Sequence, residues 1–141
     1  MLTPSDITRI KNKITKTLGA NASISPTRIN TLLPIKSLQG KLYEADVLAT
    51  ICEKLVTQER LQITLAGGSN LMLKQKGGPI DRRYPYFQIW KSSSLFCEMF
   101  TDVYFSTLSY FIKGSPSRKS HGDYHELDIA LVQPNLTGNL Q

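Results

Sequence analysis

The chain has 141 residues, of which 40% are hydrophobic and 9% aromatic, and this predicts one globular domain with a substantial core. No apolar run approaches the ~20 residues that cross a bilayer, and the start of the chain lacks a signal-peptide pattern. We therefore expect a soluble cytoplasmic protein with no membrane partner. The formal net charge of +6 favours a polyanionic partner, because clustered Lys and Arg side chains attract phosphate groups.

The basic residues gather in three parts of the chain, and this segregation favours DNA as the partner. The first group, within residues 9–16, could equally form the outer side of a helix that packs on the core. The candidate nucleic-acid contacts come from the middle and late groups, which are Lys74, Lys76, Arg82, Arg83, Arg118 and Lys119.

The sequence contains two cysteines, Cys52 and Cys97. Both lie among apolar residues, and they lack the CxxC spacing that is typical of zinc or redox sites. This pattern predicts free thiols in a reducing compartment rather than a disulfide or a metal site.

The first predicted helix carries apolar residues at helical spacing from residue 7 to residue 18, with Ser5 or Asp6 as its cap and Gly19 near its end. Residues 20–40 contain two prolines and many polar residues, and we expect a connector with at most a short helix from Ser25-Pro26. This divides the chain into an N-terminal helical arm and connector, residues 1–40, and an α/β core, residues 41–141.

The second predicted helix, residues 41–58, has a wide apolar half, and Glu44 falls inside it. A carboxylate that faces a core must be paired, protonated or bound to a metal ion, because a stranded charge costs several kcal/mol. The alternative is that Glu44 lies at the margin of the apolar half and reaches water.

After this helix the period changes from helical to alternating. Residues 61–65 and 71–73 predict a hairpin around a Gly-rich turn, and residues 84–91 predict the next strand. A long aromatic strand follows from residue 95, and its length predicts a break near residues 106–109. Glu98 and Asp102 fall on the same face of that strand if side chains alternate regularly.

The last predicted strand, residues 124–132, places two carboxylates in an otherwise apolar segment. Glu126 and Asp128 point to the same face and lie about 7 Å apart at ~3.3 Å rise per residue. Mg²⁺ prefers carboxylate and water oxygens, so this pair beside His125 could bind a divalent cation. The alternative is an ordinary strand whose polar face meets water.

Four segments together resemble the restriction-endonuclease-like superfamily, the PD-(D/E)XK nucleases. They are Leu42-Tyr43-Glu44-Ala45, Tyr84-Pro85-Tyr86, Thr101-Asp102-Val103 and His125-Glu126-Leu127-Asp128. The resemblance implies an α/β (α+β) fold with a mixed sheet of about four to five strands flanked by helices. It also implies a DNA endonuclease in which Glu44 and Asp128 bind Mg²⁺ or Mn²⁺ at the catalytic centre, with Glu126 in support.

The sequence departs from that superfamily after Val132, where a further strand should carry a (D/E)xK pair. Three explanations remain open: the chain is part of a longer nuclease, a partner chain completes the sheet, or the domain has lost catalysis. A non-catalytic domain could bind nucleic acid, or it could bind a protein through aromatic side chains such as Tyr84, Tyr86 and Trp90.

Overall fold

The computed structural model describes residues 2–25, 38–68, 77–114 and 121–138. Helices and strands follow one another in the order α1 (Pro4–Ala22), α3 (Leu38–Thr57), β1 (Gln62–Ala66), β2 (Tyr86–Lys91), β3 (Ser94–Ser106), α4 (Leu108–Ile112), the 3₁₀ helix η2 (His121–Asp123) and β4 (Tyr124–Val132). The chain is therefore an α+β protein, as the sequence predicts.

The four strands form one sheet in the order β1-β2-β3-β4, and each neighbouring pair is antiparallel. The expectation of a mixed sheet is therefore wrong for the described residues, because periodicity indicates that a segment is a strand but not its direction. The parallel pairing found there is one isolated bridge between Gly78 and Val103. The predicted return strand at residues 71–73 lies outside the described residues, and β1 pairs with β2 instead.

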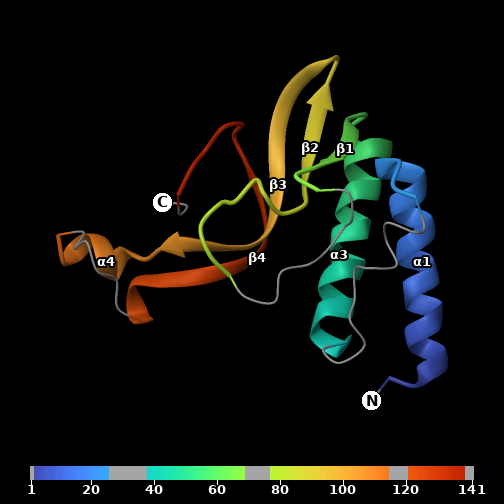
Figure 1. The fold of residues 1–141 in the computed structure, drawn as a ribbon, viewed down its shortest axis with the longest axis horizontal. Coiled ribbons are helices and arrows are strands. Elements are labelled where there is room, and N and C mark those ends of the chain that lie inside the picture. Colours follow the sequence, from blue (N-terminus) through green and yellow to red (C-terminus); the bar gives the residue numbers. More distant parts are fainter. Residues whose placement is uncertain (1, 26–37, 69–76, 115–120, 139–141) are drawn as a thin grey trace.

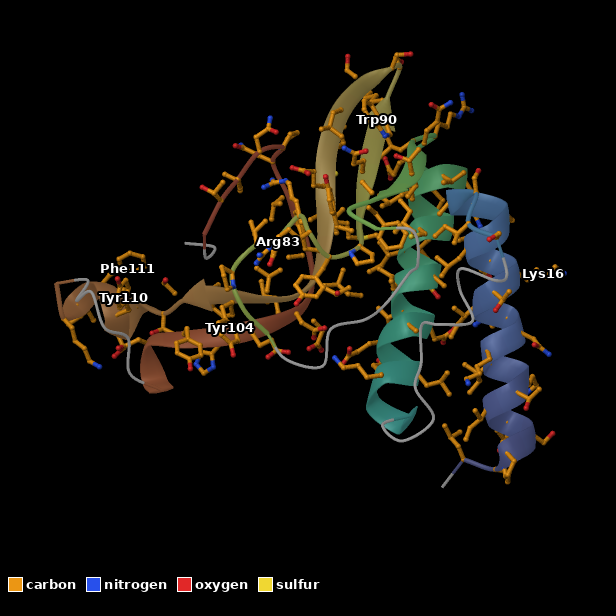
Figure 2. The ribbon with its side chains drawn as sticks, in the orientation of Figure 1. Lys16, Arg83, Trp90, Tyr104, Tyr110 and Phe111 are labelled. Carbon is orange, nitrogen blue, oxygen red and sulfur yellow. The ribbon has the colours of Figure 1, made fainter. Side chains whose placement is uncertain are left out.

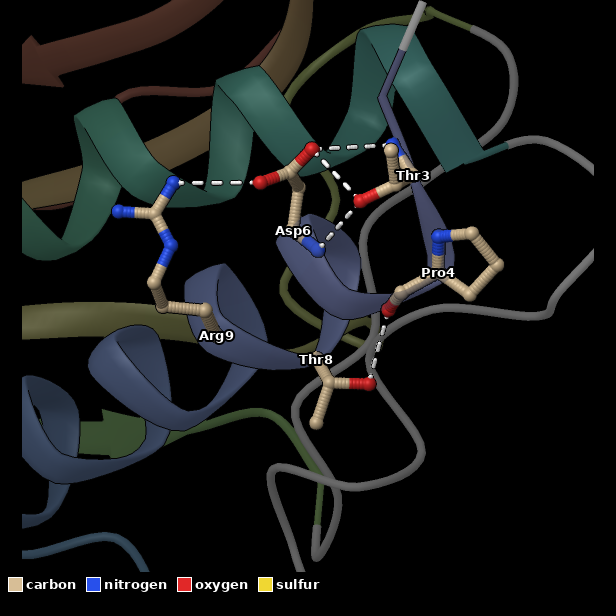
Figure 3. A network of polar contacts seen from close by, with 5 residues as sticks. All are labelled: Thr3, Pro4, Asp6, Thr8 and Arg9. Carbon is tan, nitrogen blue, oxygen red and sulfur yellow. Dashed lines mark hydrogen bonds and ion pairs between the residues drawn. The ribbon is translucent and has the colours of Figure 1, made fainter.

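The start of α1 is fixed by a capping box rather than by Ser5 or Asp6 as the cap (Figure 3). The Thr3 hydroxyl accepts a hydrogen bond from the backbone N–H of Asp6, and the Asp6 carboxylate accepts one from the backbone N–H of Thr3. Pro4 occupies the first turn, where its missing N–H costs nothing. The helix continues past Gly19, because the left-handed residue that ends it is Ser23, at φ 54°.

Helices α1 and α3 lie side by side and cover one face of the sheet (Figure 1). Burying the apolar side of each helix against the strands is the main source of stability for such a layer. Ile14 and Leu18 of α1 belong to the same core as α3, β1, β2 and the first half of β3. The buried members of this core are Ile14, Leu18, Ala22, Ile24, Leu42, Ala45, Leu48, Ala49, Cys52, Leu61, Ile63, Phe87, Ile89 and Met99.

The opposite face of the sheet carries a second, smaller cluster of Tyr86, Phe100, Val103, Ala130 and Val132. The second half of β3, α4 and the first half of β4 extend away from α1 and α3 (Figure 1). Tyr104 lies on this extension and Phe111 lies near its end (Figure 2). The helical layer therefore reaches only part of the sheet.

Local turns set both ends of β3. Ser92 and Ser93 both have positive φ, 48° and 68°, which is the backbone of a two-residue hairpin turn between β2 and β3. At its other end β3 stops at Ser106, and the Thr107 hydroxyl accepts a hydrogen bond from the N–H of Tyr110 to cap α4. The predicted break near residues 106–109 is confirmed.

Cys52 and Cys97 are free thiols, as predicted, and Cys52 is buried in the core. Burial raises the pKa of the Cys52 thiol to about 12, so its reactive thiolate is disfavoured.

Within the part of the chain that the structure describes, no helix combines the length and apolar character needed to cross a bilayer.

Candidate metal centre

Three carboxylates from three elements converge at the start of α3. Glu44 comes from α3, Asp102 from β3 and Asp128 from β4, and one oxygen of each lies within 4.8 Å of the others. Oxygens that share one ion can lie up to about 4 Å apart around Mg²⁺ and about 5 Å around Ca²⁺, which is twice the ligand distance. The structure thus brings Glu44 and Asp128 together and adds Asp102 to them, at a spacing that spans Ca²⁺ directly and Mg²⁺ after the side chains close in by less than about 1 Å.

Glu44 reaches this cluster from the first part of α3, and Lys41 lies three residues before it on the same helix face. The Lys41 ammonium donates to Glu44 Oε2 at 2.8 Å and to Asp102 Oδ1 at 3.1 Å. The side chains of Lys41 and Glu44 are only 20% and 19% exposed. Glu44 is therefore an inward, paired carboxylate rather than one at the margin of the helix that reaches water.

Asp102 joins the cluster because the backbone of β3 is irregular there. Its φ is 53°, a left-handed conformation that is uncommon outside glycine, although aspartate tolerates it better than most residues. Phe100 and Val103 both belong to the second cluster, although regular alternation would put them on opposite faces. The expectation that Asp102 shares a face with Glu98 is therefore wrong, and Asp102 instead contacts Lys41 of α3.

The segment before β2 supports this irregular backbone. The N–H of Gly78 donates to the carbonyl of Asp102 at 3.2 Å, and the N–H of Tyr104 donates to the carbonyl of Gly78 at 2.8 Å. The carbonyl of the left-handed residue and the N–H two residues later are thus both satisfied by Gly78.

The Asp102 side chain is fully buried, and only one of its oxygens has a partner in the described residues. Oδ1 accepts from Lys41, whereas Oδ2 accepts no hydrogen bond there. Burial raises the pKa of Asp102 to about 6 against the opposing effect of Lys41, and the nearby Glu126 carboxylate raises it further.

Glu126 lies beside the cluster but outside the group of three carboxylates. It packs against Gly77, where an added Cβ would lie 2.5 Å from Glu126 Oε2 and 2.5 Å from the Tyr104 ring. Glycine at residue 77 thus lets Glu126 and Tyr104 approach the backbone closely, and a larger residue would make these side chains shift. Asp128, two residues further along β4, is exposed and supplies the open side of the cluster.

The charge of the cluster suits a divalent cation. Three carboxylates and one ammonium leave two negative charges when all four groups are ionised. The oxygen-only donor set is the one that hard cations such as Mg²⁺ and Ca²⁺ prefer. The unpartnered Oδ2 of Asp102 is a buried acceptor whose desolvation a cation would compensate.

The six basic residues predicted to contact nucleic acid have different surroundings. The Arg82 guanidinium donates to both oxygens of the buried Glu98, at 2.7 and 3.0 Å, and to the carbonyl of Leu136. Arg82 is therefore engaged within the fold, whereas Arg83 is exposed and pairs with Asp81. The other four, Lys74, Lys76, Arg118 and Lys119, lie outside the described residues.

The aromatic residues predicted to meet a protein partner are also unequal. Tyr86 is buried and stacks on Phe100 at 4.9 Å between ring centroids, so it is a core residue and not part of an exposed patch. The Trp90 indole N–H donates to the hydroxyl of Thr64 across the β1–β2 pair. Of the three, Tyr84 is the exposed one.

Comparisons with protein-family models, with curated proteins and with solved structures found no match to this chain. The likeness to the restriction-endonuclease-like superfamily therefore remains a prediction from the residues.

Proposed function

We propose that this chain is a metal-dependent, nuclease-like domain that acts on DNA and binds a divalent cation, Mg²⁺ or Mn²⁺, at Glu44, Asp102 and Asp128. The observation that carries the proposal is the convergence of these three carboxylates, one of them buried with an unpartnered oxygen. Bringing these carboxylates together lowers the stability of the fold. Strained backbone and perturbed acids of this kind are concentrated at functional sites.

The chemistry that such a cation supplies is polarisation of a phosphate oxygen and activation of water for attack on phosphorus. In this chain Glu44, Asp102 and Asp128 would hold the cation, and Glu126 would add negative charge beside them. The exposed position of Asp128 leaves that side of the cluster accessible to a substrate.

The net charge of +6 supports a polyanionic substrate. Among the described residues, α1 presents exposed basic side chains, and Lys16 points away from the sheet (Figure 2). Two of the other basic residues on α1 already pair with acids, Arg9 with Asp6 and Lys13 with Asp46. These exposed pairs are weak, so they would exchange readily for phosphate contacts.

The proposal predicts cleavage of DNA that depends on the cation. Supercoiled plasmid and single-stranded DNA are incubated with the chain in Mg²⁺, in Mn²⁺ or in EDTA, and nicking is followed on gels. Asp128→Asn and Glu44→Gln should each lower the rate about a hundredfold or more, because the charge stabilisation that a metal ion provides is worth several kcal/mol.

Glu53→Gln is the matched control, since Glu53 is an exposed acid on the same helix. It should cleave at the wild-type rate. Equal activity of Asp128→Asn and wild type, or cleavage that persists in EDTA, would refute the proposed centre. Absence of cleavage under all conditions would refute catalysis by this chain alone.

A second candidate, a non-catalytic module that binds a protein or a nucleic acid, is favoured by apolar side chains at the far end of the molecule. Leu108 and Ile112 of α4 are 74% and 75% exposed. Exposed apolar groups of this size are typical of protein contacts. β4 is also an edge strand within the described part of the sheet, so a second chain could pair with it. Binding of DNA or protein that survives Asp128→Asn, without cleavage, would support this candidate.

A further inference from the structure

Lys41 occupies the position between the carboxylates that the proposed cation would need. Its ammonium contacts Glu44 Oε2 at 2.8 Å and Asp102 Oδ1 at 3.1 Å, and both residues belong to the group of three acids. The side chain is 20% exposed, and it comes from the first turn of α3. A long side chain at this place has a short route to water on the open side of the cluster.

An ammonium and a divalent cation would compete for the charge of these carboxylates, because both are positively charged. Mg²⁺ ligands lie at 2.0–2.1 Å from the ion, so an ion held by Glu44 and Asp102 would lie close to the present ammonium nitrogen. Both are positively charged, and their repulsion is strong where water is excluded. An ion held on Glu44 Oε2 and Asp102 Oδ1 would therefore favour movement of the Lys41 side chain away from them.

We infer that the Lys41 ammonium is an internal competitor of the divalent cation, holding the acids together until the cation displaces it toward solvent. The inference rests on the proposed function, because it assumes that the three acids bind the cation. In this role Lys41 balances one of the three negative charges that the carboxylates bring together. It also predicts that the chain binds its cation more weakly than the carboxylates alone would.

The buried Oδ2 of Asp102 favours replacement of the Lys41 ammonium by the cation. Lys41 satisfies Oδ1 but leaves Oδ2 without a partner among the described residues. A cation at the cluster would contact carboxylate oxygens more closely than the ammonium does and would compensate the buried charge more fully. Lys41 is thus a partial counter-ion that a stronger one can replace.

The first measurement is Mn²⁺ and Mg²⁺ affinity by calorimetry for wild type, Lys41→Met and Lys16→Met. Lys16 is an exposed lysine on α1, so its substitution changes the net charge equally but leaves the cluster intact. Lys41→Met should bind about tenfold more tightly or better, and Lys16→Met should match wild type. Lys41→Gln, which keeps a hydrogen-bond donor without the charge, should also bind more tightly and guards against misfolding of the Met variant.

The second measurement follows the Lys41 ammonium itself in the wild-type chain, by ¹⁵N NMR of the lysine side chains with Mg²⁺. The Lys41 signal is identified by its absence in Lys41→Met. It should differ from the exposed lysines before Mg²⁺ is added and move to their position on saturation.

The outcomes separate this inference from the proposed function. If Mg²⁺ binds and is weakened by Asp128→Asn, but the Lys41 signal stays unchanged and Lys41→Met binds like wild type, the competitor role is overturned while the cation centre stands. If neither wild type nor Lys41→Met binds Mg²⁺ or Mn²⁺, the proposed function fails and the inference fails with it.

Discussion

Glu98 and Asp102 lie four residues apart on β3, and they are 2% and 0% exposed, yet their surroundings are opposite. Glu98 receives two hydrogen bonds from Arg82 and a third from the backbone N–H of Asn135. Asp102 receives one bond from Lys41, and its second oxygen has no partner in the described residues. The Arg82 guanidinium lowers the pKa of Glu98, whereas burial raises the pKa of Asp102 to about 6.

Burial of a charge therefore does not by itself indicate a functional site. Glu98 is buried and fully paired, which is how an acid contributes to a fold. Asp102 is buried, one of its oxygens has no hydrogen-bond partner in the described residues, and its backbone is left-handed. These features are typical of an acid that binds a ligand. The difference between the two residues can be tested by changing either one or by making one resemble the other.

Removal of the paired acid should have the largest effect on stability. Glu98→Ala leaves the Arg82 guanidinium and the Asn135 N–H without their acceptor, and we expect a loss of about 3 kcal/mol in the free energy of unfolding. Urea unfolding measures it, with Glu53→Ala as the control for loss of an exposed acid. A loss below that of the control would mean that Glu98 is not a structural acid.

Removal of the incompletely paired acid should instead stabilise the chain. Asp102→Asn at pH 8 should raise the free energy of unfolding by about 2 kcal/mol, because it removes a charge whose pKa is raised in the folded state. The Asn amide can also donate to Glu126. The same variant should lose cation binding.

The pH dependence of this gain follows from the direction of the shift. A raised carboxyl pKa means that the folded chain binds the proton more tightly than the unfolded chain does. The destabilisation by the ionised Asp102 is therefore present above pH 6 and is relieved as the pH falls toward the ordinary carboxyl pKa near 4. The advantage of Asp102→Asn should therefore vanish between about pH 6 and pH 4. A gain that is equal at pH 8 and pH 4 would contradict the raised pKa.

The smallest effect should come from making Glu98 resemble Asp102. Arg82→Lys replaces a two-pronged donor by a single ammonium, and we expect a loss of about 1 kcal/mol. The pKa of Glu98, followed by NMR titration of its side-chain carboxyl carbon, should rise relative to wild type because the Arg82 bonds are what lower it. An unchanged pKa would show that the fork geometry is not the cause.

The sequence predicts those parts of the molecule that depend on hydrophobic periodicity. The predicted helix at residues 41–58 corresponds to α3, and the predicted strand at residues 124–132 corresponds to β4. The long β3 ends where its length indicated a break. The same pattern placed Glu44 on the inner side of its helix, which is how the meeting of Glu44 with Asp128 could be anticipated.

The sequence does not predict Asp102 or Lys41 as members of the cluster, because periodicity assumes a regular backbone. One left-handed residue reverses the face on which later side chains lie, and no apolar pattern reports it. A detectable signal was present, however: Asp102 is an acid within an aromatic strand, and Lys41 precedes Glu44 by three residues. A search for helical acids with a lysine one turn away would have found Lys41, and a search for acids within apolar strands would have found Asp102.

The left-handed backbone of Asp102 also protects the alignment of β3 with β4. Asp102 is flanked by Thr101, which pairs with Ile129, and by Val103, which pairs with Leu127. Thr101 and Val103 are both β-branched. Sliding the strand by one position would force the positive φ onto one of these two residues, which resist it far more strongly than aspartate does. The irregular backbone at Asp102 therefore favours the observed register, which brings Asp102 and Asp128 between the Thr101–Ile129 and Val103–Leu127 pairs.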